Sequence, residues 1–166
     1  MRLEVSQPRE STTVIADEFR TASYTITPVK NAENMSVIMK TGQAGDEVIA
    51  KFDFRTLRAD RFWLRGKELD INKYLQKKTF SSTRTFTTAQ GRTYSWAPAG
   101  VSSLVLRNEG GWEIGRSHNA SRGIVGKEKH GAYIEIDDYD DLFHDLDELV
   151  ITFAYIKEKE RRDRGA

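Results

Sequence analysis

Through the first four-fifths of the chain, apolar and polar residues alternate over short segments that end at Gly, Asn or Pro. Such alternation is typical of a strand with one buried face. Thr and aromatic residues, which suit a half-buried pleated surface, are frequent in these segments. Spacings of about 8–12 residues between strand starts are what sandwiches and barrels show. The predicted strands are 24–27, 35–40, 48–54, 61–65, 83–88, 92–96, 104–106, 112–115 and 132–136.

One short segment, residues 69–75, fits two different structures. Asp70 is of a residue type that caps helix N-termini, so the segment fits a helical turn that begins there. It also fits two half-strands, and the local pattern does not distinguish the two.

The C-terminal segment has the spacing of a helix. Its apolar residues recur at intervals of four and three, and the middle of the segment is apolar on every side, which requires burial on every side. Acidic residues lie toward its start and basic residues toward its end, which complements the helix dipole. A buried strand over 149–156 is the alternative, because four of these residues are β-branched, but the pattern favours the helix. The spaced positions are Leu142, Leu146, Leu149, Phe153 and Ile156.

The chain of 166 residues is long enough for one domain with a sizeable core. Neither an internal repeat nor a low-complexity stretch divides it. We therefore expect a single domain over 1–166, with residues 1–22 as a loose N-terminal arm and residues 162–166 as a frayed tail.

Three stretches, 48–54, 84–96 and above all 148–162, resemble a fungal family of uncharacterised domains. That family belongs to the tubby C-terminal-like group, with the LURP-one and phospholipid-scramblase families. The resemblance covers roughly residues 20 to 162 and implies a β-rich fold, α+β by count. It implies a closed antiparallel β-barrel of about 10–12 short strands around a C-terminal hydrophobic helix, which would fill the barrel interior. Tubby proteins are known as phosphoinositide-binding modules and scramblase-like relatives act on phospholipids, so the resemblance also implies a lipid ligand.

Composition narrows the function classes. The chain has no cysteine, which excludes disulfides, cysteine metal sites and a thiol nucleophile. The longest apolar run, residues 149–156, is far shorter than the roughly 20 residues of a membrane-spanning helix, so we expect no transmembrane segment. The N-terminus lacks the apolar stretch of a secretory signal, so we expect a cytoplasmic protein, peripheral at membranes where it binds them.

No catalytic or metal-binding pattern is present. The three histidines, His118, His130 and His144, share no metal-ligand spacing, and the acidic run 137–141 does not fit a calcium loop, so it reads as a helix-start cluster. The chain contains no phosphate-binding glycine loop and no Gly-x-Ser-x-Gly motif. We therefore expect a non-enzymatic domain without a cofactor.

The charge distribution indicates a binding surface. Net charge over the whole chain is +1, but residues 51–92 carry eleven bases against four acids, with aromatic residues interleaved. Such a surface suits anionic phospholipid or phosphoinositide head groups, which we expect as the ligand in preference to nucleic acid. Two alternatives remain: a protein-interaction or scaffold domain, and a solvated face whose bases meet the acidic run of the same molecule. The candidate ligand-binding residues are Arg61, Arg65, Lys67, Lys73, Lys77, Lys78, Arg84 and Arg92.

Overall fold

The computed structural model describes residues 1–9, 11–17, 19, 23–121, 130–137 and 140–165. Within these residues the chain forms thirteen strands and two helices. The strands are β1 (Arg2–Arg9), β2 (Thr12–Asp17), β3 (Ser23–Val29), β4 (Ala32–Gly42), β5 (Gly45–Asp53), β6 (Arg61–Leu64), β7 (Lys67–Asp70), β8 (Gln76–Lys77), β9 (Arg84–Thr87), β10 (Thr93–Pro98), β11 (Leu104–Asn108), β12 (Glu113–His118) and β13 (Ala132–Ile136). The helices are α1 (Ile71–Tyr74) and α2 (Asp140–Gly165).

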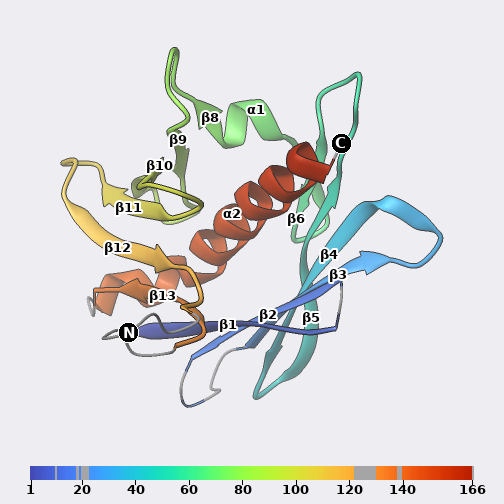
Figure 1. Ribbon diagram of the computed structural model, residues 1–166, viewed down its shortest axis with the longest axis horizontal. Helices are drawn as coiled ribbons and strands as arrows, with labels where there is room; N and C mark the ends of the chain where they lie inside the picture. The colour runs from blue at the N-terminus through green and yellow to red at the C-terminus, as the bar shows by residue number, and fades with distance from the viewer. Residues whose placement is uncertain (10, 18, 20–22, 122–129, 138–139, 166) are drawn as a thin grey trace.

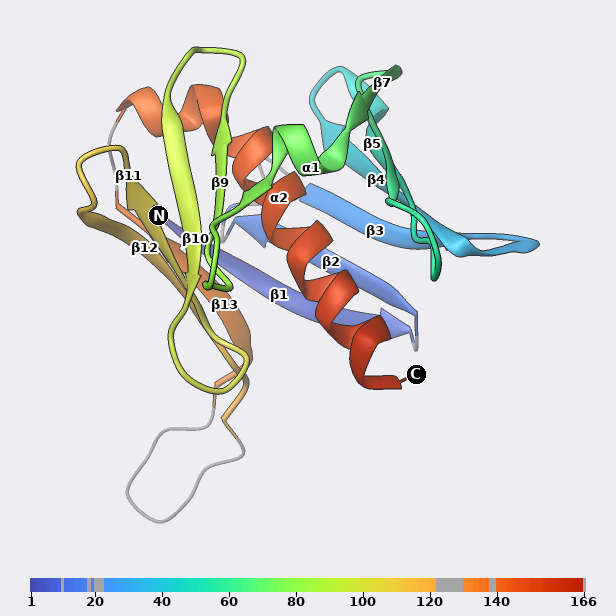
Figure 2. The same cartoon turned by 90° about the horizontal axis from the view of Figure 1, so that it is seen from above.

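One antiparallel sheet contains all the described strands, in the order β7-β6-β5-β4-β3-β2-β1-β13-β12-β11-β10-β9-β8. The first strand, β1, lies in the middle of the sheet, because it pairs with β2 on one side and with β13 on the other. It therefore joins the half of the sheet built from β2–β7 to the half built from β8–β13. The sheet curves around α2, which crosses its concave side (Figures 1 and 2).

The expected closed barrel is wrong, because the sheet is open: β7 and β8 are its two edges and are not paired with each other. The edge strands are only four and two residues long, and the chain between them forms α1. Asp70 caps this helix, accepting from the backbone N–H groups of Asn72 and Lys73, so the helical-turn reading of 69–75 is confirmed. Backbone groups that could have joined the two edges instead form a helical turn.

Side chains of α1 fill the gap that the backbone leaves open. The Tyr74 ring lies 5.2 Å from Phe62 of β6 and 6.4 Å from Phe86 of β9, distances at which aromatic rings attract one another. The Tyr74 hydroxyl donates to Oε2 of Glu148 on α2 at 2.5 Å. Tyr74 thus connects β6 and β9, the strands next to the two edges, through aromatic packing, and binds α2 through one hydrogen bond.

The predicted C-terminal helix is confirmed, and the alternative of a strand over 149–156 is wrong, because α2 runs from Asp140 to Gly165. Every residue from Leu149 to Ile156 is buried. Within this stretch, Thr152 accepts from the indole N–H of buried Trp96 at 3.0 Å and donates to the carbonyl of Glu148 at 2.8 Å. Its hydroxyl is therefore satisfied within the core.

Both ends of the chain differ from the expectation. The prediction of a loose N-terminal arm over 1–22 is wrong, because this part of the chain forms β1 and β2, which are internal strands of the sheet. Their apolar signal in the sequence is weak because only the face toward α2 is buried, as at Leu3 and Ile15. The predicted frayed tail belongs to α2 as far as Gly165. Arg162 holds this end of the helix, through an ion pair with Glu158 and a position 4.4 Å from the ring centre of Phe54.

None of the described helices is both long and apolar enough to span a membrane.

The contribution of the hydrogen bond between Trp96 and Thr152 to the stability of the fold can be tested by substitution of Thr152. In Thr152→Val the side-chain shape stays, but the buried indole N–H loses its acceptor, which we expect to lower the free energy of unfolding by about 1–3 kcal/mol. Thr152→Ser, which keeps the hydroxyl, is the matched control and should lose less. Urea unfolding followed by tryptophan fluorescence measures both. Equal stability of Thr152→Val and wild type would contradict a role for this bond.

Candidate functional site

Two of the candidate arginines are bound to aspartates of α2. Arg92 Nε donates to Oδ2 of Asp145 at 2.5 Å, and the Tyr94 hydroxyl donates to the same oxygen at 2.7 Å. Burial raises the pKa of Asp145, but these hydrogen bonds outweigh burial and hold the pKa below its usual value. Burial of Tyr94 and its hydrogen bond to Asp145 raise the pKa of the Tyr94 hydroxyl to about 12. Arg92 thus anchors the start of α2 rather than facing a ligand.

Asp147 forms a second anchor one half-turn further along α2. It accepts from the Tyr24 hydroxyl at 2.8 Å, from Lys40 Nζ at 2.7 Å and from Arg65 at 3.1 Å. Burial raises the pKa of Asp147, but Lys40, Tyr24 and Arg65 together bring it below the usual range. Arg65 and Arg92 therefore do pair with acids of the same molecule, but these acids are Asp147 and Asp145 of α2 and not the acidic run 137–141.

The other two candidate arginines are also engaged. Arg61 forms two bonds to the Glu68 carboxylate, at 2.7 and 2.8 Å, and stacks over Trp63 at 4.6 Å. Arg84 is half-buried, 5.8 Å from the ring centre of Tyr155.

The four candidate lysines are placed differently. Lys67, Lys73, Lys77 and Lys78 are all exposed, and no carboxylate in the described part of the chain lies within ion-pair distance of them. Lys73 lies on α1, Lys77 ends β8 and Lys78 follows it, so these three come from one continuous segment at the edge of the sheet. Lys67 begins β7, on the opposite edge strand. The eight candidates therefore divide into engaged arginines and exposed lysines.

The loop between β8 and β9 adds an aromatic residue to these lysines, and it stands out from the body of the molecule (Figure 1). Two backbone hydrogen bonds hold it, from Lys78 N to the Thr83 carbonyl at 3.0 Å and from Ser81 N to the Lys78 carbonyl at 3.1 Å. They place Phe80 third in a β-turn, with φ of 57°, a value that Gly or Asn normally takes at this position. The Phe80 side chain is fully exposed. We call Lys73, Lys77, Lys78 and Phe80 the basic loop.

Among the described residues, no group of three His, Asp or Glu is placed to hold a metal ion. Of the histidines, His118 stacks on Tyr133 at 4.4 Å and His130 meets the same ring edge-on at 5.4 Å, so both are packed against an aromatic residue. Of the acidic run 137–141, Asp140 begins α2, whereas Asp138 and Tyr139 lie outside the described residues.

The fold defines this protein as an open antiparallel sheet wrapped around a buried C-terminal helix. Residues 6–163 match the model of a family described as a family of unknown function (DUF6593), so the chain belongs to that family. No curated protein and no solved structure matches the chain.

The anchors on α2 predict how stability depends on pH. A carboxyl group whose pKa is lower in the folded than in the unfolded state stabilises the fold above the unfolded pKa, and this stability is lost as pH falls through the folded pKa. Since Asp145 and Asp147 are both shifted downward, we expect the free energy of unfolding to fall as pH drops below about 4. Urea unfolding at a series of pH values measures this.

The variant Asp147→Asn distinguishes the contribution of Asp147 from that of the other carboxylates that titrate at low pH. It removes the charge that Lys40 and Arg65 share, and we expect a loss of about 1–3 kcal/mol at neutral pH and a shallower acid dependence. Asp163→Asn, at an exposed carboxylate near the other end of α2, is the control and should resemble wild type. An unchanged acid profile in Asp147→Asn would show that this carboxylate does not stabilise the fold.

Proposed function

We propose that this domain is a non-enzymatic module that binds anionic membrane surfaces through the basic loop. Phe80 would enter the interfacial region of the bilayer, and Lys73, Lys77 and Lys78 would contact head-group phosphates. The observation that carries the proposal is the conformation and exposure of Phe80.

Phe80 contributes little to the stability of the fold. A bulky residue at positive φ is an outlier, with a cost on the order of 1–3 kcal/mol, and a fully exposed phenyl ring gains nothing from burial in the free protein. Two hydrogen bonds in the loop hold the ring outward. An apolar ring held away from the core at the tip of a projecting loop suits insertion into an apolar medium, and a bilayer interface provides one.

The charges beside Phe80 favour an anionic bilayer. A lysine near an anionic leaflet contributes about 1 kcal/mol, and the attraction decays over roughly one Debye length, so only exposed, unpaired lysines close to the contact take part. Lys77 and Lys78 meet this condition, and Lys73 lies on α1, directly before β8. A few lysines and one aromatic ring give weak, reversible and salt-sensitive binding.

Vesicle sedimentation tests the proposal. We expect wild-type protein to bind phosphatidylcholine vesicles that contain phosphatidylserine at low salt, and to be released by raised salt. Lys77→Glu with Lys78→Glu reverses the local charge and should abolish binding, whereas Phe80→Ser should weaken it several-fold. The protein should bind vesicles in which a phosphoinositide replaces phosphatidylserine at equal total charge more tightly only if it recognises the phosphoinositide head group itself.

Matched controls exist elsewhere on the surface. Lys30→Glu with Lys51→Glu makes the same change in charge at two exposed lysines outside the loop, and Leu57→Ser removes another exposed apolar side chain. These variants should bind as wild type does. The proposal fails if folded wild-type protein binds no anionic vesicle at low salt, or if the control variants lose as much binding as the loop variants.

A further inference from the structure

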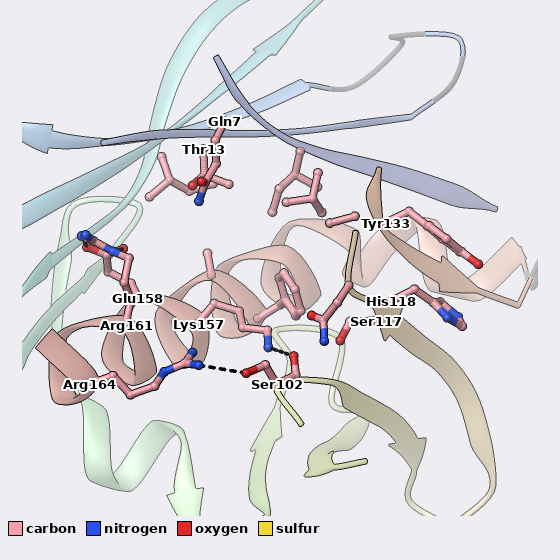
Figure 3. Close-up of a pocket in the computed structure, with 17 residues that line it drawn as sticks. Gln7, Thr13, Ser102, Ser117, His118, Tyr133, Lys157, Glu158, Arg161 and Arg164 are labelled. Carbon is pink, nitrogen blue, oxygen red and sulfur yellow. Dashed lines mark hydrogen bonds and ion pairs between the residues drawn. The ribbon is translucent and has the colours of Figure 1, made fainter. Parts of the chain in front are cut away.

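A second site lies on the concave side of the sheet, away from the basic loop. There, strands β1, β2, β3 and β13 face the C-terminal half of α2 across a cavity of about 310 Å³ (Figure 3). Its floor is apolar and comes from both layers. The floor residues are Val5, Ile15, Ile26, Ala132, Phe153 and Ala154.

The rim of this cavity is basic. Lys157, Arg161 and Arg164 line it from successive turns of α2, against one lining acid, Glu158, and the segment 157–164 holds five bases against three acids. In Figure 3, Lys157 and Arg164 reach toward Ser102, a residue of the β10–β11 connection, while Gln7 and Thr13 face them from the sheet. The cavity therefore combines an apolar interior with cations at its opening.

Lys157 is the central cation of the rim. Its side chain is only 24% exposed, and its ammonium donates to the Ser102 carbonyl and lies 3.5 Å from a carboxylate oxygen of Glu160. Burial lowers the pKa of Lys157, and the Glu160 carboxylate offsets this only in part. An ammonium group has three donors, so with one directed at the Ser102 carbonyl and one at Glu160, a third is left to donate to an anionic partner.

The other two rim cations differ in how strongly they are engaged. Arg161 is held by Glu158 at 2.6 Å, whereas Arg164 donates to the Ser102 hydroxyl at 3.0 Å and lies 3.9 Å from Glu160. Arg164 is thus held only loosely by a carboxylate. Lys157 and Arg164 both bond to Ser102, so a ligand anion at the opening could contact the two cations together.

We propose that this cavity binds one single-chain anionic amphiphile of the fatty-acid class, with its chain on the apolar floor and its carboxylate at Lys157 and Arg164. The volume is at the lower end of small-molecule sites, which suits one chain rather than the two of a phospholipid. An inorganic anion would leave the floor without a partner, and a neutral lipid would leave the cations without one. The site shares no residue with the basic loop, so it stands independently of the membrane proposal.

Titration calorimetry with monomeric dodecanoate, below its micelle concentration and without vesicles, tests this inference. We expect saturable binding at one site, with dodecanol and dodecyltrimethylammonium each at least about tenfold weaker, because one lacks the charge and the other reverses it. Lys157→Met keeps the length of the side chain but removes the ammonium, and should weaken dodecanoate binding by at least about tenfold. Lys30→Met makes the same change at an exposed lysine outside the cavity and should leave binding unchanged.

A second variant keeps the test decisive if Lys157→Met proves unstable. Ala132→Leu, at a half-buried position of the floor, fills the space for the chain without changing charge, and should abolish binding in a protein with a wild-type circular dichroism spectrum. The inference is overturned if wild type does not bind dodecanoate, if dodecanol binds as tightly as dodecanoate, or if folded Ala132→Leu binds normally. Vesicle binding by wild type without dodecanoate binding would support the basic loop and exclude this site.

Discussion

The whole structure depends on burying a helix that is apolar on every side. The stretch from Leu149 to Ile156 cannot rest on one face of a flat sheet, because its other face would stay in water. The sheet therefore has to curve around α2, and thirteen mostly short strands provide that curve. The central position of β1 follows from the same constraint, since the two halves of the sheet cover opposite sides of the helix and must be joined.

Polar groups on a buried helix need partners, and these partners fix how the helix sits within the sheet. Asp145, Asp147 and Glu148 bind side chains from β10, β3 and α1 respectively, and Thr152 binds Trp96 deeper in the core. Apolar packing alone would tolerate sliding or rotation of α2, whereas each of these bonds is satisfied in one position only. Glu148 has a further effect: by binding Tyr74, it holds α1 in the gap where the edge strands fail to pair.

Part of the fold and of the candidate site could be predicted from the sequence. The helix was predictable because its apolar spacing and end charges are local signals, whereas residues 69–75 fitted both a helical turn capped by Asp70 and two half-strands. That the sheet stays open was not predictable, since pairing of β7 with β8 depends on what the five residues between them do. β1 and β2 carry too few apolar residues to stand out, so the cavity floor was hidden as well. The anchors join residues 53 and 82 positions apart, and no local pattern reveals such pairs.

The basic segment shows why an excess of charge in a sequence is an incomplete guide to a binding surface. Its arginines Arg55, Arg61, Arg65 and Arg92 each hold a carboxylate, and two of these carboxylates belong to α2, outside the segment. A planar, weakly hydrated guanidinium suits such fixed contacts, whereas the strongly hydrated ammonium of lysine is more readily left in water. For these four arginines and for the exposed Lys67, Lys73, Lys77 and Lys78, this difference separates paired charge from charge available to a partner. Three of these four lysines belong to the basic loop, beside the one aromatic ring that the fold leaves entirely uncovered there.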